Sequence, residues 1–205
     1  MSVRLVALTD LERFPDPTAA LSRLCALAQP GSVAIVLRDK DAGYQTRLAL
    51  GQNLRRITRE AGQQLLVADR VDLALELEAD GVHLPADGLL PSEASRLFPG
   101  ALLSRAHHDA LELSESELAR LDILLISPAF AERKGRPALG ARGLEARSRL
   151  LRGAARARLL ALGGVDAGNV AQALAAGADG VAAIGAAQEP VQQDALVAAL
   201  GIARE

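Results

Sequence analysis

Two adjacent histidines, His107 and His108, follow one short apolar segment, and His83 lies at the end of another. An imidazole changes its charge near neutral pH, so it can take up and return a proton during a reaction. Neighbouring side chains at a strand end point to opposite sides, so we expect one of the paired histidines to face a site and the other to be structural. A metal cluster is less favoured, because no second set of ligands has suitable spacing. The alternative is that these are surface or supporting imidazoles.

Arg38 and Lys40 lie two residues apart after a further apolar segment, so both side chains could lean toward the same side. A guanidinium fork and an ammonium point charge together suit a phosphate or diphosphate. Asp39 and Asp41 are adjacent, so the alternative is a set of solvated loop charges. The Asp69 carboxylate could hold a cation or orient a substrate group, or it could cap the helix that follows.

Eight short and nearly continuous apolar runs must position these groups, with amphipathic stretches between them. Such runs are typical of parallel strands covered on both faces. The expected strands are 5–8, 33–37, 64–68, 81–84, 101–104, 123–126, 159–162 and 180–184. The expected helical stretches include 16–28, 42–60, 92–98, 166–175 and 190–203.

About eight strand–helix units in 205 residues predict a small (β/α)8 TIM barrel, with residues 1–205 as a single domain. A doubly wound sheet shares the alternation, but its Gly-x-Gly-x-x-Gly fingerprint is missing. Active sites of such barrels lie where the strands end, so the polar residues named above would converge on one rim.

The Gly163-Gly164 and Gly185-Ala186 turns would then follow the last two strands. Barrels commonly bind a phosphate at this corner through backbone amides, and glycine lets the backbone approach the anion. The alternative is two tight turns without a ligand. The segment 131–143 is rich in Gly and Arg and follows the sixth strand, so we interpret it as a lid over an anionic ligand rather than a plain surface loop.

The composition argues against several classes of function. The net charge is −2 and only 2% of the residues are aromatic, so we expect neither a nucleic-acid partner nor an anionic membrane surface. Charged residues interrupt every apolar run, so no membrane span is expected. Cys25 is the only cysteine, which fits a reducing compartment, and we expect a cytoplasmic protein.

The order of the motifs resembles the thiamine phosphate synthase and thiazole tautomerase (TenI-like) superfamily of small barrels. The resemblance runs over nearly the full length and rests on an ordered set of short motifs. They include Asp-Arg-Val-Asp at 69–72, Asp-Gly-Val-His-Leu-Pro at 80–85, Ser-Arg-Ala-His-His at 104–108 and Leu-Gly-Gly-Val at 162–165.

The synthase branch joins a pyrimidine diphosphate to a thiazole phosphate, with Mg²⁺ neutralising the diphosphate leaving group. Arg38, Lys40 and Asp69 match the pattern of that branch, but several of its polar positions are replaced. Val36 stands for its glutamine, Ala68 for its asparagine, Ala106 for its serine, and Gly88 for its metal-binding aspartate unless Asp87 substitutes. Losing several partners of a charge-assisted set should cripple the coupling chemistry.

The tautomerase branch is similar in other respects and needs no Mg²⁺. Its members share a proline after the fourth strand, here Pro85, and an Arg-x-x-His motif that aligns Arg105 and His108. They also share a Lys-Gly lid, which Lys134-Gly135 resembles. In that branch the fifth-strand histidine moves a proton so that an exocyclic thiazole tautomer becomes aromatic.

We therefore expect a thiazole tautomerase with His108 as acid/base and His107 as the alternative. The resemblance assigns the phosphate to Gly163, Gly164, Gly185 and Ala186, and other substrate contacts to Arg38, Lys40, Asp69, His83, Arg105 and Lys134. Because Gly185 stands where the family has a serine, backbone amides must carry more of the phosphate site.

Two alternatives stay open beside the tautomerase. One is an Mg²⁺-dependent synthase with Asp69 and Asp87 as metal ligands, and the other is a non-catalytic binder of a phosphorylated ligand. Under the tautomerase hypothesis no metal or cofactor is expected. The expected partner is a small phosphorylated thiazole or pyrimidine, and the resemblance suggests a homodimer.

Overall fold

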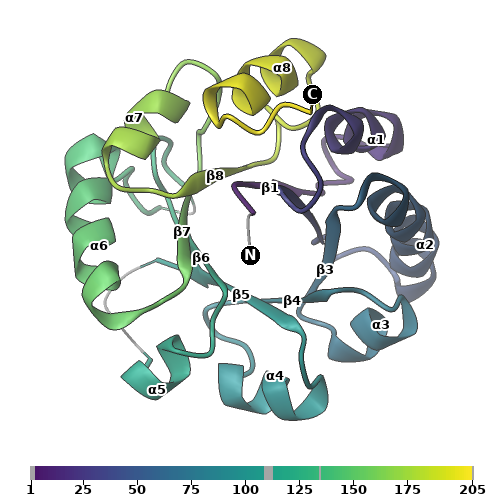
Figure 1. Ribbon diagram of the computed structural model, residues 1–205. Coiled ribbons are helices and arrows are strands. Elements are labelled where there is room, and N and C mark those ends of the chain that lie inside the picture. Colours follow the sequence, from purple (N-terminus) through teal and green to yellow (C-terminus); the bar gives the residue numbers. More distant parts are fainter. Residues whose placement is uncertain (1–2, 109–112, 134, 205) are drawn as a thin grey trace.

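Eight parallel strands pair in sequence order and close on themselves, because β1 pairs with both β2 and β8. The computed structural model describes residues 3–108, 113–133 and 135–204 (Figure 1). The strands are β1 (Leu5–Leu8), β2 (Val33–Leu37), β3 (Gln64–Ala68), β4 (Gly81–Leu84), β5 (Leu102–His107), β6 (Ile123–Ile126), β7 (Arg158–Leu162) and β8 (Gly180–Ala183). The predicted small (β/α)8 barrel is confirmed.

Helices alternate with the strands and form a ring around the barrel (Figure 1). They are α1 (Thr18–Leu27), α2 (Tyr44–Ala61), α3 (Val71–Glu76), α4 (Pro91–Leu97), α5 (Glu115–Leu118), α6 (Gly140–Ala154), α7 (Val170–Ala175) and α8 (Pro190–Ala199). Within the described residues, none of these helices is long and apolar enough to cross a membrane.

The strands are apolar on both faces because they separate two cores. Alternate residues such as Val6, Val36 and Leu125 fill the barrel interior. Their neighbours, such as Ala7 and Ile35, pack with the surrounding helices in a second and larger core. Burial on both faces is the physical reason why the strands read as unbroken apolar runs.

The difference from the predicted elements that matters most for the site concerns β5, which extends to His107 instead of ending at residue 104. Its register continues beside β6, with His107 opposite Ile126. Arg105 and His107 are therefore strand residues with fixed facing, although their polarity suggested a loop. Segment 131–143 is also shorter as a loop than predicted, because α6 begins at Gly140.

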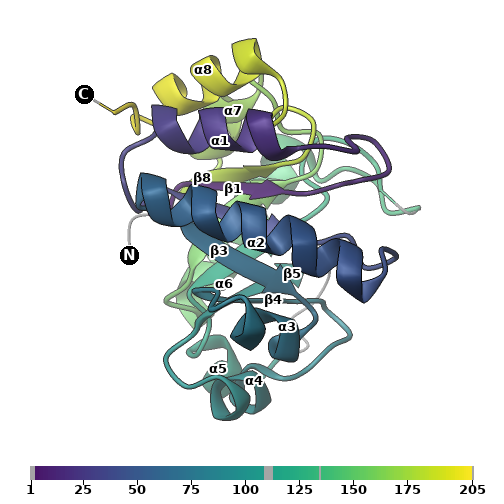
Figure 2. The same ribbon diagram turned by 90° about the vertical axis from the view of Figure 1, so that its right-hand side faces the viewer.

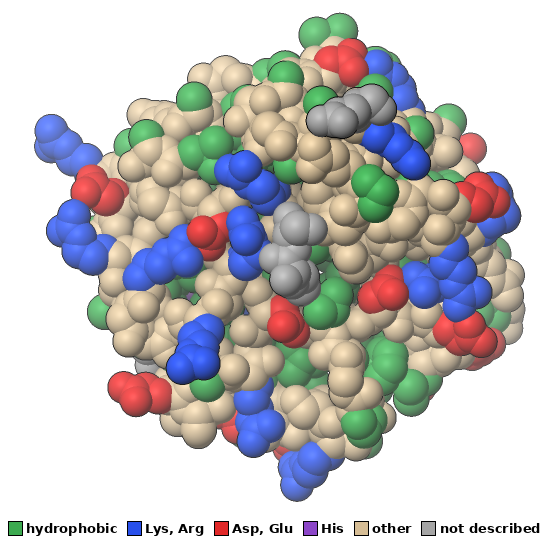
Figure 3. Space-filling model, viewed as in Figure 1, with side chains coloured by type: hydrophobic (Ala, Val, Ile, Leu, Met, Phe, Trp, Pro, Cys, Tyr) green, Lys and Arg blue, Asp and Glu red, His purple; other side chains and the backbone are tan. Residues whose placement is uncertain are grey.

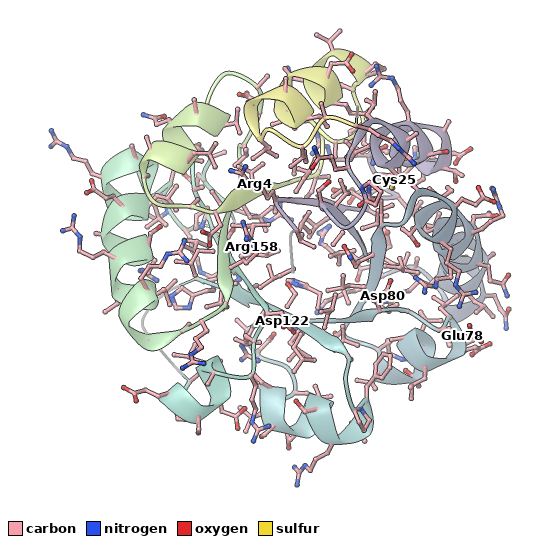
Figure 4. The ribbon with its side chains drawn as sticks, viewed as in Figure 1. Arg4, Cys25, Glu78, Asp80, Asp122 and Arg158 are labelled. Carbon is pink, nitrogen blue, oxygen red and sulfur yellow. The ribbon has the colours of Figure 1, made fainter. Side chains whose placement is uncertain are left out.

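The end of the barrel where the strands begin is held by a repeated carboxylate contact. An aspartate just before β4, β6 or β8 accepts a hydrogen bond from a backbone N–H at the start of the preceding strand. Asp80 binds the N–H of Leu65 at 2.7 Å, Asp122 that of Leu103 at 2.8 Å, and Asp179 that of Leu159 at 2.8 Å. Figure 4 labels Asp80 and Asp122 on this face, and Figure 3 shows basic and acidic side chains interspersed over it.

The loops that follow the strands lie at the other end. In Figure 2 the purple loop after β1 and the dark-blue loop before α2 both project to the right of the barrel. The expected convergence of strand ends therefore exists, at the end of the barrel away from the carboxylate contacts.

Candidate active site

A pocket of about 1290 Å³ opens at the end where the strands finish. Residues from all eight strands or from the loops after them line it. Of the predicted site residues, His83, His108, Arg38, Lys40, Gly163, Gly164, Gly185 and Ala186 are on its wall. Lys134 lies outside the described residues.

His108 is the histidine of the pair that reaches this pocket. Its Nδ1 lies 3.2 Å from the carbonyl oxygen of Ser127. A carbonyl oxygen can only accept, so Nδ1 carries a proton and Nε2 is the basic nitrogen of the neutral ring. A neutral imidazole held in this way is suited to take a proton from a ligand in the pocket.

His107 and Arg105 do not line the pocket, because they alternate with the inward residues of β5. Nε2 of His107 accepts a hydrogen bond of 3.0 Å from Arg147, which also donates to the carbonyl of His108 at 3.3 Å. The Arg105 guanidinium donates to the carbonyls of Leu89 and Ala86 in the loop after β4. Direct substrate contact by Arg105, and the use of His107 as the alternative acid/base, therefore do not fit their placement.

His83 lines the pocket with its ring buried, and its Nδ1 is 2.9 Å from the hydroxyl of Ser104. Burial lowers the pKa of His83 to about 4, and the positive charges of Lys40 and Arg38 add to this effect. The imidazole is neutral at physiological pH, so it can hydrogen-bond a ligand without adding charge.

Arg38 and Lys40 line the pocket near the ends of β2 and β3, and Asp39 between them lies on the same wall. The Asp39 carboxylate accepts hydrogen bonds from the Thr9 hydroxyl and from the N–H of Leu11. The nearest carboxylate recorded for Arg38 is Asp10, at 4.0 Å. We call this pair of basic side chains the cation end of the pocket.

Asp69 forms an ion pair with Lys40 of the cation end and does not cap helix α3. Its Oδ2 lies 2.9 Å from the Nζ of Lys40. The cap position of α3 is Arg70, so the alternative interpretation of Asp69 as the helix cap is wrong. Asp69 adopts a left-handed backbone with φ of 71°, which turns the chain between β3 and α3.

The residues present do not fit the Mg²⁺ site that the synthase pattern implies. Within the described residues, no group of three or more His, Cys, Asp or Glu side chains is placed to hold a metal ion. Position 88, the family's metal-binding aspartate, is a glycine whose Cβ would lie 3.6 Å from Oδ1 of Asp69. That Cβ would also lie only 2.6 Å and 2.8 Å from ring atoms of Pro85, so this space is already filled.

Two glycines after β7 form part of the opposite end of the pocket. Gly163 and Gly164 have φ angles of 104° and 67°, which disfavour any residue with a Cβ. A Cβ on Gly164 would lie 2.5 Å from the Cβ of Ala131 and 2.7 Å from its backbone nitrogen. Glycine is therefore required for the β7 loop to pack against the β6 loop, whether or not a phosphate binds there.

Arg13, from the β1 loop, is a pocket residue that the sequence did not reveal. Its Nη2 lies 3.4 Å from the position that a Cβ would occupy on Gly185. A guanidinium therefore stands beside the place where the family pattern has a serine side chain. We call Gly163, Gly164, Gly185, Ala186 and Arg13 the glycine end. The one feature of the sequence that could have indicated Arg13 is a basic residue shortly after the first strand.

The loop after β6 contributes two more arginines, Arg133 and Arg136, to the pocket wall. Their backbones pair with each other through two hydrogen bonds of 3.1 Å and 3.0 Å. The sequence predicted that this basic loop contributes Lys134 to the pocket. Among the described residues of the loop, Arg133 and Arg136 line the wall.

Comparison with known proteins gives a consistent result. Residues 5–187 match the family model described as thiamine monophosphate synthase. A thiamine-phosphate synthase of Methanoculleus marisnigri is 39% identical over 183 residues, covering 86% of each chain. One of Moorella thermoacetica is 35% identical over 157 residues, covering 76% of this chain and 74% of that protein.

A solved structure, thiamine phosphate pyrophosphorylase from Pyrococcus furiosus, superposes with a TM-score of 0.78 at 26% identity. The match covers 98% of this chain and 94% of that one. The likeness therefore includes all eight strand–helix units.

Proposed function

The chain belongs to the thiamine monophosphate synthase family, and from this premise we propose that it is a transferase of thiamine biosynthesis. It would join a pyrimidine diphosphate to a thiazole phosphate. The bond between the pyrimidine methylene carbon and the diphosphate oxygen breaks, and the diphosphate leaves with the electron pair. A bond forms between that carbon and the thiazole ring nitrogen. The proposal reverses our preference for a tautomerase, since the relatives carry the name of the synthase.

The observation that carries the proposal is that one pocket has two groups of residues suited to anions, the cation end and the glycine end. The cation end follows β2 and β3, whereas the glycine end follows β7 and β8. In the closed barrel β4 to β6 lie between the two ends on one side, whereas on the other side Arg13 brings the β1 loop into the glycine end, next to β2. The pocket of about 1290 Å³ exceeds the roughly 300–1000 Å³ typical of a single small ligand. A reaction of two phosphorylated substrates uses both ends.

Each end suits a different substrate. Arg38 and Lys40 at the cation end would hold the diphosphate, whose charge grows as it leaves. The glycine end would hold the single phosphate of the thiazole through backbone N–H groups and Arg13. The neutral His83 ring, on the wall between them, would hydrogen-bond the pyrimidine without competing for the phosphates. Holding both substrates in line is the main contribution that such a site makes to the rate.

A second candidate function, thiazole tautomerase, is supported by His108. Its Nδ1–H is held by the Ser127 carbonyl, and its basic nitrogen is left for a ligand in the pocket. Tautomerisation needs one proton acceptor and one held phosphate, so it would depend on His108 and the glycine end, with Arg38 and Lys40 only as further substrate contacts. The two candidates therefore share the glycine end and differ in whether His108 or the cation end is essential.

The decisive experiment offers the purified protein both reactions in parallel. In the first, the pyrimidine diphosphate and thiazole phosphate are mixed, and thiamine phosphate and released pyrophosphate are measured. In the second, the exocyclic thiazole tautomer is followed by proton NMR. We expect equal amounts of thiamine phosphate and pyrophosphate in the first reaction, and a strong loss in Lys40→Met but not in His108→Asn.

Turnover in the second reaction alone, lost in His108→Asn, would instead establish the tautomerase. Binding of both ligands without turnover in either reaction would contradict both enzymes and leave a non-catalytic binder.

A further inference from the structure

The Lys40–Asp69 ion pair lies where the synthase pattern has a metal-binding carboxylate. We propose that the cation end binds diphosphate without a divalent metal, because the Lys40 ammonium replaces the metal on Asp69. This inference rests on the transferase proposed above and concerns how that enzyme neutralises its leaving group.

The first argument is the state of the Asp69 carboxylate. Its Oδ2 is 2.9 Å from the Lys40 Nζ, so an ammonium already neutralises it. Mg²⁺ demands nearly ideal octahedral geometry at about 2.0–2.1 Å from its oxygen ligands. A metal on this oxygen would have to displace the ammonium, and two cations so close together would repel each other.

The second argument is the shape of the loop after β4. Gly88 donates its N–H to the carbonyl of Pro85 at 3.2 Å, which folds the loop back on itself. The Pro85 ring then occupies the space that a side chain at position 88 needs. A carboxylate at position 88 is therefore missing from the sequence and is also excluded by the packing of the loop.

The third argument concerns the other carboxylates near the cation end. Asp39 is bound to Thr9 and Leu11, and Asp10 faces Arg38. Asp87 lines the pocket, but within the described residues no third acidic, His or Cys side chain joins it and Asp69 in a metal-holding group. Asp39 and Asp10 are therefore engaged by the β1 loop and by Arg38, and Asp69 is engaged by Lys40.

The positive charges at the cation end come from side chains. Lys40 supplies a point charge and Arg38 supplies a planar fork, and both line the pocket. Arg133 and Arg136 line the same pocket from the loop after β6. Charge-assisted hydrogen bonds from such groups can hold a diphosphate directly, without a bridging metal.

The first test measures binding rather than turnover, with inorganic pyrophosphate and Mn²⁺ as separate probes. Calorimetry of the wild-type protein in EDTA is expected to show pyrophosphate binding. Lys40→Met is expected to weaken it about tenfold or more, since a charge-assisted contact is lost. Wild-type protein titrated into Mn²⁺ alone is expected to leave the electron paramagnetic resonance signal of free Mn²⁺ unchanged. The proposal is overturned if EDTA abolishes pyrophosphate binding. It is also overturned if the wild-type protein binds Mn²⁺ in the absence of pyrophosphate.

The second test rebuilds the missing site. The variant Lys40→Met/Pro85→Gly/Gly88→Asp removes the ammonium, opens the space and adds the second carboxylate. It is expected to bind Mn²⁺. The matched variant with Gly88→Asn, which has the same shape without the charge, is expected not to bind it. Equal Mn²⁺ binding by the wild type and the Asp variant contradicts the replacement of the metal by Lys40.

These outcomes separate the inference from the proposed function. If the protein binds pyrophosphate in EDTA but makes no thiamine phosphate, the metal-free site is supported and the transferase is contradicted. If the protein makes thiamine phosphate only with Mg²⁺, the transferase is supported and the metal-free site is contradicted.

Discussion

His108 and Ser127 directly follow the neighbouring strands β5 and β6, and the His108 imidazole meets the Ser127 carbonyl at 3.2 Å on the wall of the pocket. The carbonyl fixes the proton on Nδ1 and leaves Nε2 as the basic nitrogen. The register between the two strands thus decides the chemical state of the candidate acid/base.

Replacing His108 by asparagine tests its role in proton transfer. An asparagine amide can still donate to the Ser127 carbonyl, but it cannot accept a proton. We expect tautomerisation of the thiazole substrate, wherever it is detected, to fall by about 10²- to 10⁴-fold, the usual contribution of a general base. Proton NMR of the substrate measures the rate. A loss of thiazole phosphate affinity of the same size would show instead that His108 only shapes the pocket.

The second prediction concerns His83 and the pH dependence of stability. Burial lowers its pKa from 6.5 to about 4, so between these values the unfolded chain binds a proton that the folded protein does not. The free energy of unfolding should therefore fall as the pH drops from 6.5 to 4, by about 3 kcal/mol from this residue.

Urea unfolding of the wild type and of His83→Gln across this pH range measures the effect. The difference between the two proteins should shrink toward low pH, because only the wild type carries the titrating imidazole. A difference that stays constant across the range would contradict a lowered pKa.

The third prediction tests the glycine end through Gly164. Alanine there must adopt a φ of 67° and would bring its Cβ within 2.5 Å of Ala131, so the β7 loop has to move. We expect the affinity for thiazole phosphate to fall about tenfold or more, measured by calorimetry on protein with wild-type circular dichroism. Gly153→Ala is the matched control, because its Cβ meets nothing within 4 Å in helix α6.

The fourth prediction tests Arg13 at the same end. Its guanidinium stands 3.4 Å from the place of a Cβ on Gly185, where it can donate to a bound phosphate. Arg13→Met should weaken thiazole phosphate binding about tenfold and leave pyrophosphate binding at the cation end nearly unchanged. Arg149→Met is the control, since Arg149 is an exposed residue of helix α6 paired with Glu145. Equal losses for both ligands would mean that Arg13 acts through the overall charge of the pocket.

The fifth prediction concerns stability at the opposite face. Asp122→Ala removes the acceptor for the N–H of Leu103, a residue that is 2% exposed. An unsatisfied buried N–H costs about 1–3 kcal/mol, so the free energy of unfolding should fall by that amount. Asp122→Asn retains an oxygen acceptor and should lose clearly less, as measured by urea unfolding. Similar losses in both variants would assign the effect to the charge instead.

The sequence by itself determined the barrel and the end of it that carries the site. Short apolar runs such as Val33–Leu37 and Ile123–Ile126 were recognisable because strands buried on both faces must be apolar throughout. That requirement is local, and each run shows it without reference to the rest of the chain. The polar residues that follow the strands could then be assigned to one rim from the parallel topology alone.

Only the tertiary structure decided what each polar residue does on that rim. It turned His108 inward and Arg105 outward, paired Lys40 with Asp69, and brought Arg13 beside Gly185. Lys40 and Asp69 are 29 residues apart, and Arg13 and Gly185 come from opposite ends of the chain. Contacts between such distant residues depend on strand register and on closure of the barrel, and neither is written into the local pattern of residue types.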